Sequence, residues 1–328
     1  MLVKDNPDSF LSGDEPFISA KLLDGSDSRV DMEVLFESHH EGFIGIPHGG
    51  LAMGLCVDAW RNSNTFTYPV NMQFRFGGTG VRIGDAATFT VERGSDPDEP
   101  RIRTQITKNG AETPYLRAEL SPASVPDGSI SAMRRPPAEF RPLPYYRNCF
   151  VCGHQRTVPG LERRFRVHTG EKDSTVTVEW GASPEDRDRA RLFLMGKDEL
   201  HPTVLMSIFD ENTAWGGFMQ TRSAGLSAKM TVTLLRPIRR SESLLFVGRP
   251  LGTRGNPRSP RFFVAQGSVF SMSDPSSPEL IAYGKGDWII MKEYTKQIKE
   301  NLLPEGDWEW IFGEEENEGV DRQGRDEG

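Results

Sequence analysis

Two segments of this 328-residue chain share one layout, and this internal repeat limits the folds that the chain can adopt. In the first, a glycine-rich loop at residues 41–50 leads into an apolar run at residues 51–60. In the second, about 150 residues later, a His-Pro-Thr tripeptide at 201–203 precedes a similar run at 204–211. Glycine and proline punctuate loops, and each apolar run is typical of a buried helix. The repeat therefore predicts two copies of one helix-containing unit.

Strand-like runs surround the two predicted helices, which span residues 48–61 and 202–219. In the first half, one run precedes the helix and four follow it: 30–36, 68–76, 86–92, 102–108 and 114–120. In the second half, two runs precede the helix and four follow it: 161–168, 175–180, 227–235, 244–247, 261–270 and 280–291. One helix followed by an antiparallel meander is typical of the α+β class, so we expect an α+β fold in each half.

A shift in composition separates the two halves, because five prolines fall between residues 126 and 144. We expect this stretch to be a stiff, semi-extended linker. The predicted segments are a leader at 1–24, an N-terminal domain at 25–122, the linker at 123–147, a C-terminal domain at 148–293, and a C-terminal segment with an acidic tail at 294–328. Within the last segment, residues 292–303 favour a short helix, and the aromatic motif 308–312 is expected to dock on the body or on a partner chain.

Charge and hydropathy exclude several classes of function. The net charge is −8, of which residues 314–328 carry −5, from seven acidic residues and two arginines. The sequence has no basic stripe of the kind that would indicate nucleic-acid binding. No apolar run approaches the roughly 18–20 residues needed to span a bilayer, so no membrane span is expected. The first 17 residues are acidic and lack an apolar core, so a cytoplasmic protein without a secretory signal is the expectation.

Cys149, Cys152 and His154 lie close together in the sequence and offer three ligand types that zinc accepts. A fourth ligand is not evident nearby, and no second cysteine pair exists among the three cysteines of the chain. We therefore predict no metal site, and interpret Cys149 and Cys152 as a buried pair at the start of the second unit. No Gly-x-Ser-x-Gly elbow and no phosphate-binding loop supports a serine hydrolase or a nucleotide hydrolase.

The most informative chemistry in the sequence is at the start of the first helix, where Gly49 and Gly50 follow His48. Amides in the first turn of a helix lack partners within the helix and carry partial positive charge. They can hold an anion, or a carbonyl oxygen that becomes one during a reaction.

Four segments of the chain resemble the acyl-coenzyme A thioesterase superfamily of hotdog-fold proteins, including its phenylacetate-pathway type. The segments are the glycine loop at 40–50, Cys-Phe-Val-Cys-Gly at 149–153 with Gly160-Leu161, the helix at 200–211 with its Asp-Glu signature, and the strand at 227–237 that ends in Arg-Pro. The likeness covers roughly residues 25–122 and 148–292. It implies a double hotdog, in which two helix-plus-sheet units form a pseudo-dimer within one chain.

In this family each active site lies between two units, one supplying the glycine loop and the other an acidic residue nine positions after its own loop histidine. That position is Asp210 in the second unit and Val57 in the first, where Asp58 comes one residue late. The second unit in turn has Pro202, which has no N–H to donate, in its loop. The resemblance therefore implies one working site and one degenerate site per chain.

The working site implied by the resemblance consists of His48, Gly49, Gly50, Asp210 and Ser227. The glycine amides, Gly50 above all, would stabilise the oxyanion of a thioester carbonyl. Asp210 would act as general base or as nucleophile, and Ser227 would orient water beside it. The expected substrate is a thioester of coenzyme A or acyl carrier protein, with no separate cofactor.

Arginines in turns of the second unit are candidates for binding coenzyme A phosphates: Arg236, Arg239, Arg240 and Arg254. Two such chains can pair further, so a homodimer stays open. Two other functions also stay open at this point. One is an acyl-thioester-binding or scaffold protein without catalysis. The other is an enoyl-thioester hydratase or dehydratase, although residues 196–201 lack the Asn-Pro of the pattern Asp-x-Asn-Pro-x-His.

Overall fold

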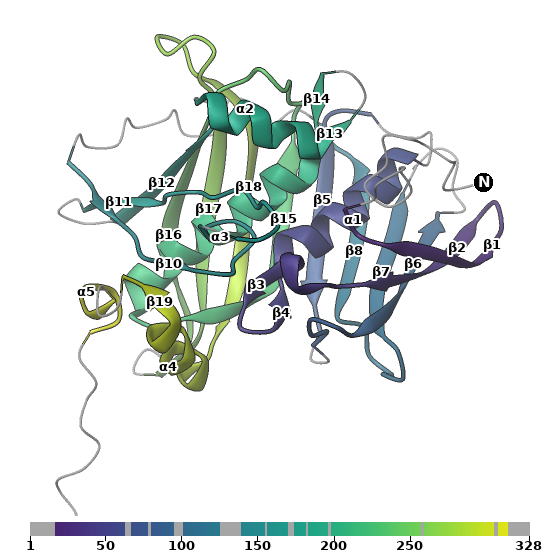
Figure 1. Ribbon diagram of the computed structural model, residues 1–328, viewed down its shortest axis with the longest axis horizontal. Helices are drawn as coiled ribbons and strands as arrows, with labels where there is room; N and C mark the ends of the chain where they lie inside the picture. Colours follow the sequence, from purple (N-terminus) through teal and green to yellow (C-terminus); the bar gives the residue numbers. More distant parts are fainter. Residues whose placement is uncertain are drawn as a thin grey trace, which may run out of the picture.

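A single antiparallel sheet of thirteen strands forms one layer of the molecule, and two long helices lie side by side across one face of it (Figure 1). The computed structural model describes residues 17–62, 67–77, 80–94, 101–124, 139–154, 156–169, 174–181, 183–195, 198–256, 259–304 and 308–313. No helix in these ranges is long and apolar enough to cross a membrane.

In the part of the chain that the structure describes, the first half has eight strands and one long helix. The strands are β1 (Ala20–Gly25), β2 (Arg29–Leu35), β3 (Glu41–Phe43), β4 (Ile46–Pro47), β5 (Val70–Phe76), β6 (Ala86–Arg93), β7 (Ile102–Lys108) and β8 (Leu116–Pro122), and the helix is α1 (Gly49–Asn62). Buried and exposed residues alternate along β2, β5 and β7, because successive side chains of a strand point to opposite faces. One face of the sheet therefore packs on the helices.

The described residues of the second half form eleven strands and four helices. The strands are β9 (Arg141–Pro142), β10 (Tyr145–Tyr146), β11 (Arg166–Thr169), β12 (Ser174–Trp180), β13 (Leu194–Met195), β14 (Glu199–Leu200), β15 (Gly225–Leu234), β16 (Leu244–Asn256), β17 (Ser259–Ser271), β18 (Glu279–Ile290) and β19 (Leu302–Leu303). The helices are α2 (Pro184–Ala190), α3 (Pro202–Thr221), α4 (Lys292–Asn301) and α5 (Glu309–Phe312). Helix α3 is buried from Pro202 to Phe218, polar and acidic residues included.

The two halves have the same topology. The strand order is β2-β6-β7-β8-β5 in the first half and β12-β16-β17-β18-β15 in the second, with the helix between the first and second of these strands in the chain. The equivalent strands β5 and β15 pair antiparallel at the middle of the sheet, with Met72 opposite Val232. The predicted α+β double hotdog is confirmed.

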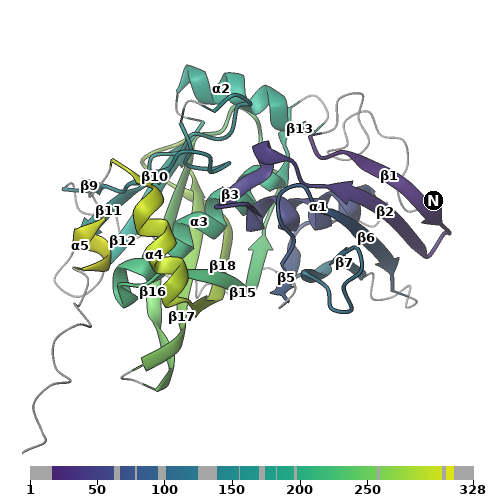
Figure 2. The same ribbon diagram turned by 60° about the horizontal axis from the view of Figure 1, so that its bottom comes forward.

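Helices α1 and α3 cross in close contact, which two glycines of α1 make possible (Figure 2). A Cβ on Gly50 would lie 2.1 Å from the Cα of Ser207, and a Cβ on Gly54 would lie 1.5 Å from the Oγ1 of Thr203. These two contacts are equivalent, because Gly50 and Thr203 each lie two residues after their loop histidine, and Gly54 and Ser207 each lie six residues after it.

Some segments differ from the sequence predictions. The predicted leader at 1–24 includes the start of β1, which pairs with β2 at the edge of the sheet. The charged segment at 184–190, where no element was predicted, forms helix α2, with Ser183 as its N-cap. Much of the predicted linker and the acidic tail lie outside the described residues.

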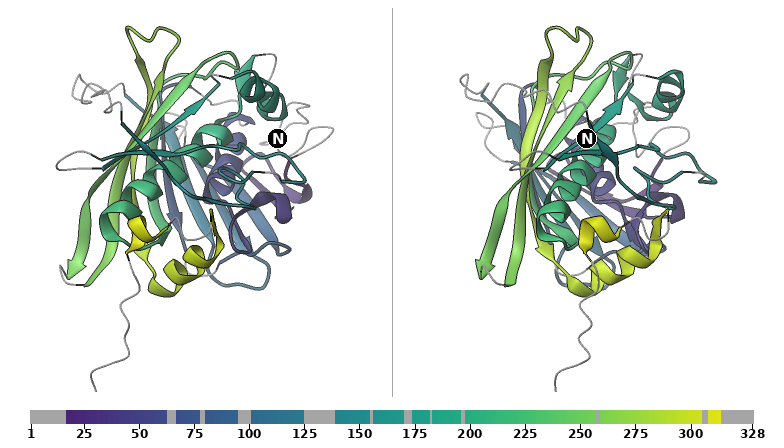
Figure 3. Two further views of the ribbon diagram at one scale, coloured as in Figure 1. Left: turned by 60° about the vertical axis from the view of Figure 1, so that its left-hand side comes forward. Right: turned by 90° about the vertical axis from the view of Figure 1, so that its left-hand side faces the viewer.

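The aromatic motif near the C-terminus packs on the body of the protein, where α4 and α5 lie beside α3 (Figure 3). Ile311 and Phe312 are buried, and the rings of Phe312 and Phe218 lie 6.2 Å apart. The Arg141 guanidinium lies 4.0 Å above the ring of Trp310. These contacts bring α4 over the end of β18, where it closes one side of the cavity described next.

Candidate active site

A cavity of about 370 Å³ lies where the N-terminus of α1 faces the middle of α3, the start of β15 and helix α4. Its polar lining includes His48, Gly49, Asp210, Glu211 and Ser227. Its walls are otherwise largely apolar and aromatic, with Phe43, Phe76, Tyr115, Phe218, Trp288 and Tyr294. Such a space, apolar with a few convergent polar groups, is the usual form of a small-molecule site.

Asp210 is the polar centre of this cavity. Its residue is 7 % exposed, and its Oδ1 accepts a hydrogen bond of 2.9 Å from the hydroxyl of Ser227 on β15. Its Oδ2 faces the start of α1, because a Cβ on Gly49 would lie only 2.9 Å from that oxygen. The structure thus brings together Asp210, Ser227, Gly49 and His48, which the sequence had assigned to one site.

Burial is the main influence on the carboxyl group of Asp210. It raises the pKa of Asp210, and the charge of Glu211 adds to this rise, whereas His48 and the Ser227 hydrogen bond lower it. The net effect is a pKa above the ordinary value of an aspartate. A pKa moved toward neutrality makes the carboxylate a stronger base than a surface aspartate.

The two glycines at the start of α1 have different surroundings. The Gly50 N–H donates to Nδ1 of His48 at 3.0 Å, so this amide already has a partner. The Gly49 N–H has no acceptor among the residues that the structure describes, and Gly49 lines the cavity. Of the two predicted oxyanion donors, Gly49 therefore has the available amide. Gly50 serves the contact with α3.

His48 belongs to one of two equivalent histidine–acid pairs. Its Nε2 lies 3.5 Å from Oε2 of Glu211, and Nε2 of His201 lies 3.2 Å from Oδ1 of Asp58. Each acidic residue comes ten positions after the loop histidine of its own unit. Asp58 is therefore the counterpart of Glu211, and not a displaced copy of Asp210.

Both loop histidines also cap their own helix. Nδ1 of His48 accepts from Gly50 N–H at 3.0 Å, and Nδ1 of His201 accepts from Thr203 N–H at 3.1 Å. An accepting Nδ1 carries no proton, so the neutral ring holds its proton on Nε2, which faces the carboxylate. Burial lowers the pKa of His48, but Cys149 and Glu211 raise it more, which favours retention of the proton on Nε2, the nitrogen that faces them.

The second copy of the site lacks the groups that define the first. The Asp210 position is occupied by Val57, which is fully buried, and the Gly49 position is occupied by Pro202. Thr203 packs its Oγ1 toward Gly54 at the helix crossing. This copy keeps the histidine–acid pair alone.

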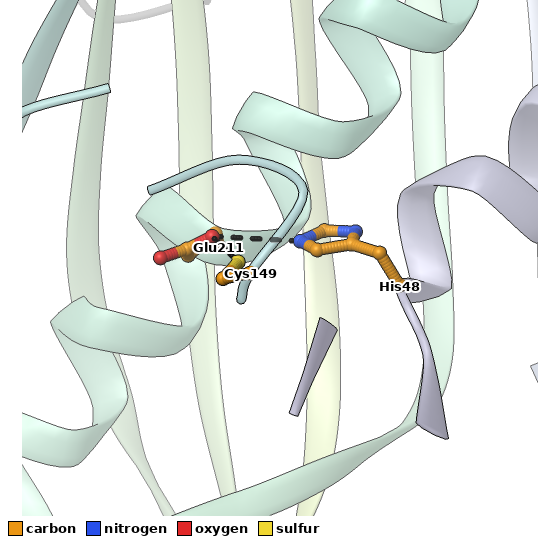
Figure 4. A group of neighbouring side chains, drawn as sticks. All are labelled: His48, Cys149 and Glu211. Atoms are coloured by element: carbon orange, nitrogen blue, oxygen red, sulfur yellow. Dashed lines mark hydrogen bonds and ion pairs between the residues drawn. The ribbon is translucent and has the colours of Figure 1, made fainter. Parts of the chain in front are cut away.

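The Cys149 thiol lies next to the Glu211 carboxylate and close to the His48 ring, as Figure 4 shows. The thiol donates to Oε2 of Glu211 at 3.2 Å, and the N–H groups of Val151 and Cys152 donate to its sulfur at 3.3 and 3.5 Å. The predicted neighbour of the pair, His154, instead packs its ring against Tyr145 and lies 3.9 Å from Glu162. Sequence spacing could not reveal this cluster, because its three members come from distant parts of the chain.

His48, Cys149 and Glu211 together are the group of described residues that could hold a metal, with ligand atoms within 4.8 Å of one another. Zinc bonds of about 2.0–2.3 Å give ligand separations of this order. The ring of His48 opposes such binding, because its Nδ1 accepts from Gly50 and its proton is therefore on Nε2, the atom that faces the cluster. The arrangement fits a hydrogen-bonded cluster better than a metal centre.

The structure does not bring the four predicted phosphate-binding arginines to the cavity. Arg236 pairs with Glu242 and Glu279 at 2.7 Å each, and Arg254 pairs with Asp287 at 3.0 Å. The backbone N–H of Arg239 donates to Glu242, and Arg240 donates to a carbonyl of α2 at 3.5 Å. The basic residue at the cavity is Arg82, which is exposed. Nothing in the sequence distinguishes it from other surface arginines.

No family model and no curated protein matches this chain, whereas solved structures do. The acyl-CoA thioesterase II TesB2 from Mycobacterium marinum is 15% identical, with a TM-score of 0.52 over 83% of this chain and 96% of that chain. The tesB protein MAP1729c from Mycobacterium avium subs paratuberculosis is 12% identical, with a TM-score of 0.51 over 82% and 96%. A bifunctional dehydratase-cyclase domain in ambruticin biosynthesis is 13% identical, with a TM-score of 0.50 over 85% and 96%.

These similarities show the fold: the chain has the double hotdog architecture of thioesterase II structures. Identities of this size carry no substrate or catalytic residue from one protein to another, and one fold hosts several activities. The function must therefore be argued from the cavity itself.

Proposed function

We propose that this protein hydrolyses an acyl thioester in the cavity between α1 and α3. The observation that carries the proposal is the buried carboxylate of Asp210, oriented by Ser227 and facing the free amide of Gly49. A buried carboxylate is costly unless partners or a function require it, and Ser227 satisfies only one oxygen of Asp210. Here its second oxygen faces the cavity, where a substrate carbonyl would meet it.

The thioester carbonyl would lie at the N-terminus of α1, with its oxygen toward the Gly49 N–H. The helix N-terminus carries partial positive charge, which stabilises the negative charge that develops on this oxygen. One such donor typically contributes about 10²- to 10³-fold in rate. The acyl group would extend along the aromatic walls. Arg82 at the exposed side would be available to a phosphate of coenzyme A.

Asp210 would act on water as a general base. Water attacks the carbonyl carbon, its proton passes to Oδ2, the carbon–sulfur bond breaks, and the leaving thiolate takes up a proton. Direct attack by the carboxylate is the other route, and it passes through a mixed anhydride that water then cleaves. A single turnover in ¹⁸O-water separates the two. The general base puts the label into the acid product. The nucleophile gives unlabelled acid in the first turnover when water cleaves the anhydride at the Asp210 carbonyl carbon, and the label then appears on Asp210.

The test of the proposal is thiol release from short, long and aromatic acyl-coenzyme A thioesters, with acyl carrier protein thioesters beside them. Wild type is compared with Asp210→Asn and with Asp58→Asn, a control that removes a buried carboxylate of α1 outside the cavity lining. Turnover that is lost in Asp210→Asn alone supports the proposal. Tight binding of the thioesters with no turnover would instead indicate a binding protein. Conversion of an enoyl thioester without thiol release would indicate a hydratase.

A further inference from the structure

The hydroxyl of Tyr294 is a buried polar group without a hydrogen-bond partner among the described residues. Tyr294 lies in the first turn of α4, is 6 % exposed, and lines the cavity that contains Asp210. Other tyrosine hydroxyls in this protein do have partners: Tyr146 donates to Glu41 at 3.1 Å, and Tyr68 donates to Glu199 at 3.2 Å. Buried hydroxyls are normally satisfied, so an unpaired one on a residue that lines a cavity points to a ligand.

The surroundings of Tyr294 leave it as a hydrogen-bond donor. Burial raises the pKa of its phenol, and so do the neighbouring groups Tyr115, Cys149, Tyr146 and Asp210. The proton therefore stays on the oxygen at neutral pH. The ring packs edge-on against Phe43, with centroids 6.0 Å apart, which fixes the side chain against the wall.

We propose that the acyl group of the substrate carries an oxygen, and that the Tyr294 hydroxyl donates a hydrogen bond to it. This inference rests on the proposed thioester site. A plain hydrocarbon chain would expel water from the cavity and leave the hydroxyl unpaired. A 3-oxoacyl, hydroxyacyl or hydroxyaryl group of the same size supplies the missing acceptor. A site that hydrogen-bonds a substrate group discriminates against the analogue that lacks it. One unpaired buried donor corresponds to about 10- to 100-fold.

The experiment compares kcat/KM for thioesters matched in length that differ by one oxygen: butyryl- with acetoacetyl-coenzyme A, octanoyl- with 3-hydroxyoctanoyl-coenzyme A, and benzoyl- with 4-hydroxybenzoyl-coenzyme A. We expect wild type to prefer the oxygenated member of at least one pair by about 10-fold or more, and Tyr294→Phe to lose that preference. The matched control is Tyr283→Phe on β18, a half-buried tyrosine outside the cavity lining, which should keep the preference.

Two outcomes would overturn the proposal. One is a wild type that prefers no oxygenated member of any pair. The other is a Tyr294→Phe variant that slows every substrate equally, since the hydroxyl would then act on the thioester carbonyl. If no thioester is turned over at all, the same pairs are measured as non-hydrolysable thioether analogues by equilibrium binding. A preference that Tyr294→Phe abolishes in Kd would then support the acyl contact even though the proposed hydrolysis had failed.

Discussion

Replacing either of two adjacent glycines by alanine should have different effects: Gly50→Ala should lower stability, and Gly49→Ala should lower activity. In Gly50→Ala the new methyl group would lie 2.1 Å from the Cα of Ser207, more than an ångström short of an ordinary contact, and the obstacle is backbone. The two helices must separate, and such overpacking typically costs about 1–3 kcal/mol. Alanine returns at most about 1 kcal/mol through its higher helix propensity. We therefore expect a net loss of about 1–2 kcal/mol.

In Gly49→Ala the nearest atoms belong to side chains instead. The methyl group would lie 2.9 Å from Oδ2 of Asp210 and 3.5 Å from Cζ of Phe76, and both side chains can move slightly. The fold should therefore persist. The methyl group would however occupy the space between the free Gly49 amide and the Asp210 carboxylate, where the thioester carbonyl has to lie. We expect kcat/KM for thiol release to fall about 100-fold, the scale of one lost oxyanion contact.

The assays are thermal unfolding by circular dichroism and thiol release per folded molecule. A loss of 1 kcal/mol lowers the melting temperature by about 1.5 °C in a protein of this length, so Gly50→Ala should melt about 1.5–3 °C early. Gly54→Ala provides an internal check, because its methyl group would lie 1.5 Å from Oγ1 of Thr203 at the equivalent contact. A Gly50→Ala protein that melts like wild type and is inactive, or a fully active Gly49→Ala protein, would refute the distinction drawn between the two glycines.

Four further predictions concern Asp210, Ser227, Asp58 and the possibility of a metal at the His48 cluster. Asp210→Asn should lower turnover by about 10²- to 10⁴-fold. Burial raises the folded-state pKa of Asp210, so wild type loses stability as pH rises through that value. Asp210→Asn cannot ionise at this position. Its melting temperature should therefore match that of wild type below about pH 4 and exceed it increasingly as pH rises, which thermal scans across pH would show. Ser227→Ala should shift the acid limb of the pH–rate profile to higher pH, because the Ser227 hydrogen bond lowers the pKa of Asp210. An unchanged limb would mean that Ser227 does not act on this carboxylate. Asp58→Ala should cost about 1–3 kcal/mol, because His201 loses a buried acceptor, yet retain turnover per folded molecule; denaturant titration beside the thiol assay tests both parts. Dialysis against a chelator should leave turnover unchanged, because the Nε2 of His48 carries a proton, and a loss restored by zinc would contradict that tautomer.

Much of the fold could be predicted because the same pattern of one helix followed by strands occurs in both halves of the sequence. Each apolar helix stands out by length and lack of charge, and the predicted strand at 102–108 coincides with β7. Hairpin turns are local, and the dipeptide Asn109-Gly110, which is typical of such turns, directly follows β7 in the sequence. Strand β1 was missed because its residues are almost all exposed, which removes the alternation that marks a half-buried strand.

The candidate site was predictable where it depends on spacing along one helix. Asp210 follows His201 by nine residues, and the structure brings it to the other unit's glycine loop, beside Ser227. Contacts between units leave no such spacing. Cys149 and Tyr294 reach the site from a loop and from α4, so their place near Asp210 depends on packing that no local pattern encodes.

The two histidine–acid pairs separate what the fold requires from what the chemistry requires. In both copies the loop histidine caps its own helix and contacts an acidic residue of the other unit, which comes ten positions after that unit's loop histidine. Each pair therefore joins one unit to the other. A feature kept in both copies serves the junction between α1 and α3. Asp210 and Gly49 occur in one copy of the site, and both line the cavity. Val57 and Pro202 occupy the equivalent positions in the other copy. Since the shared features account for the packing of both copies, the unshared ones are those that a substrate would explain.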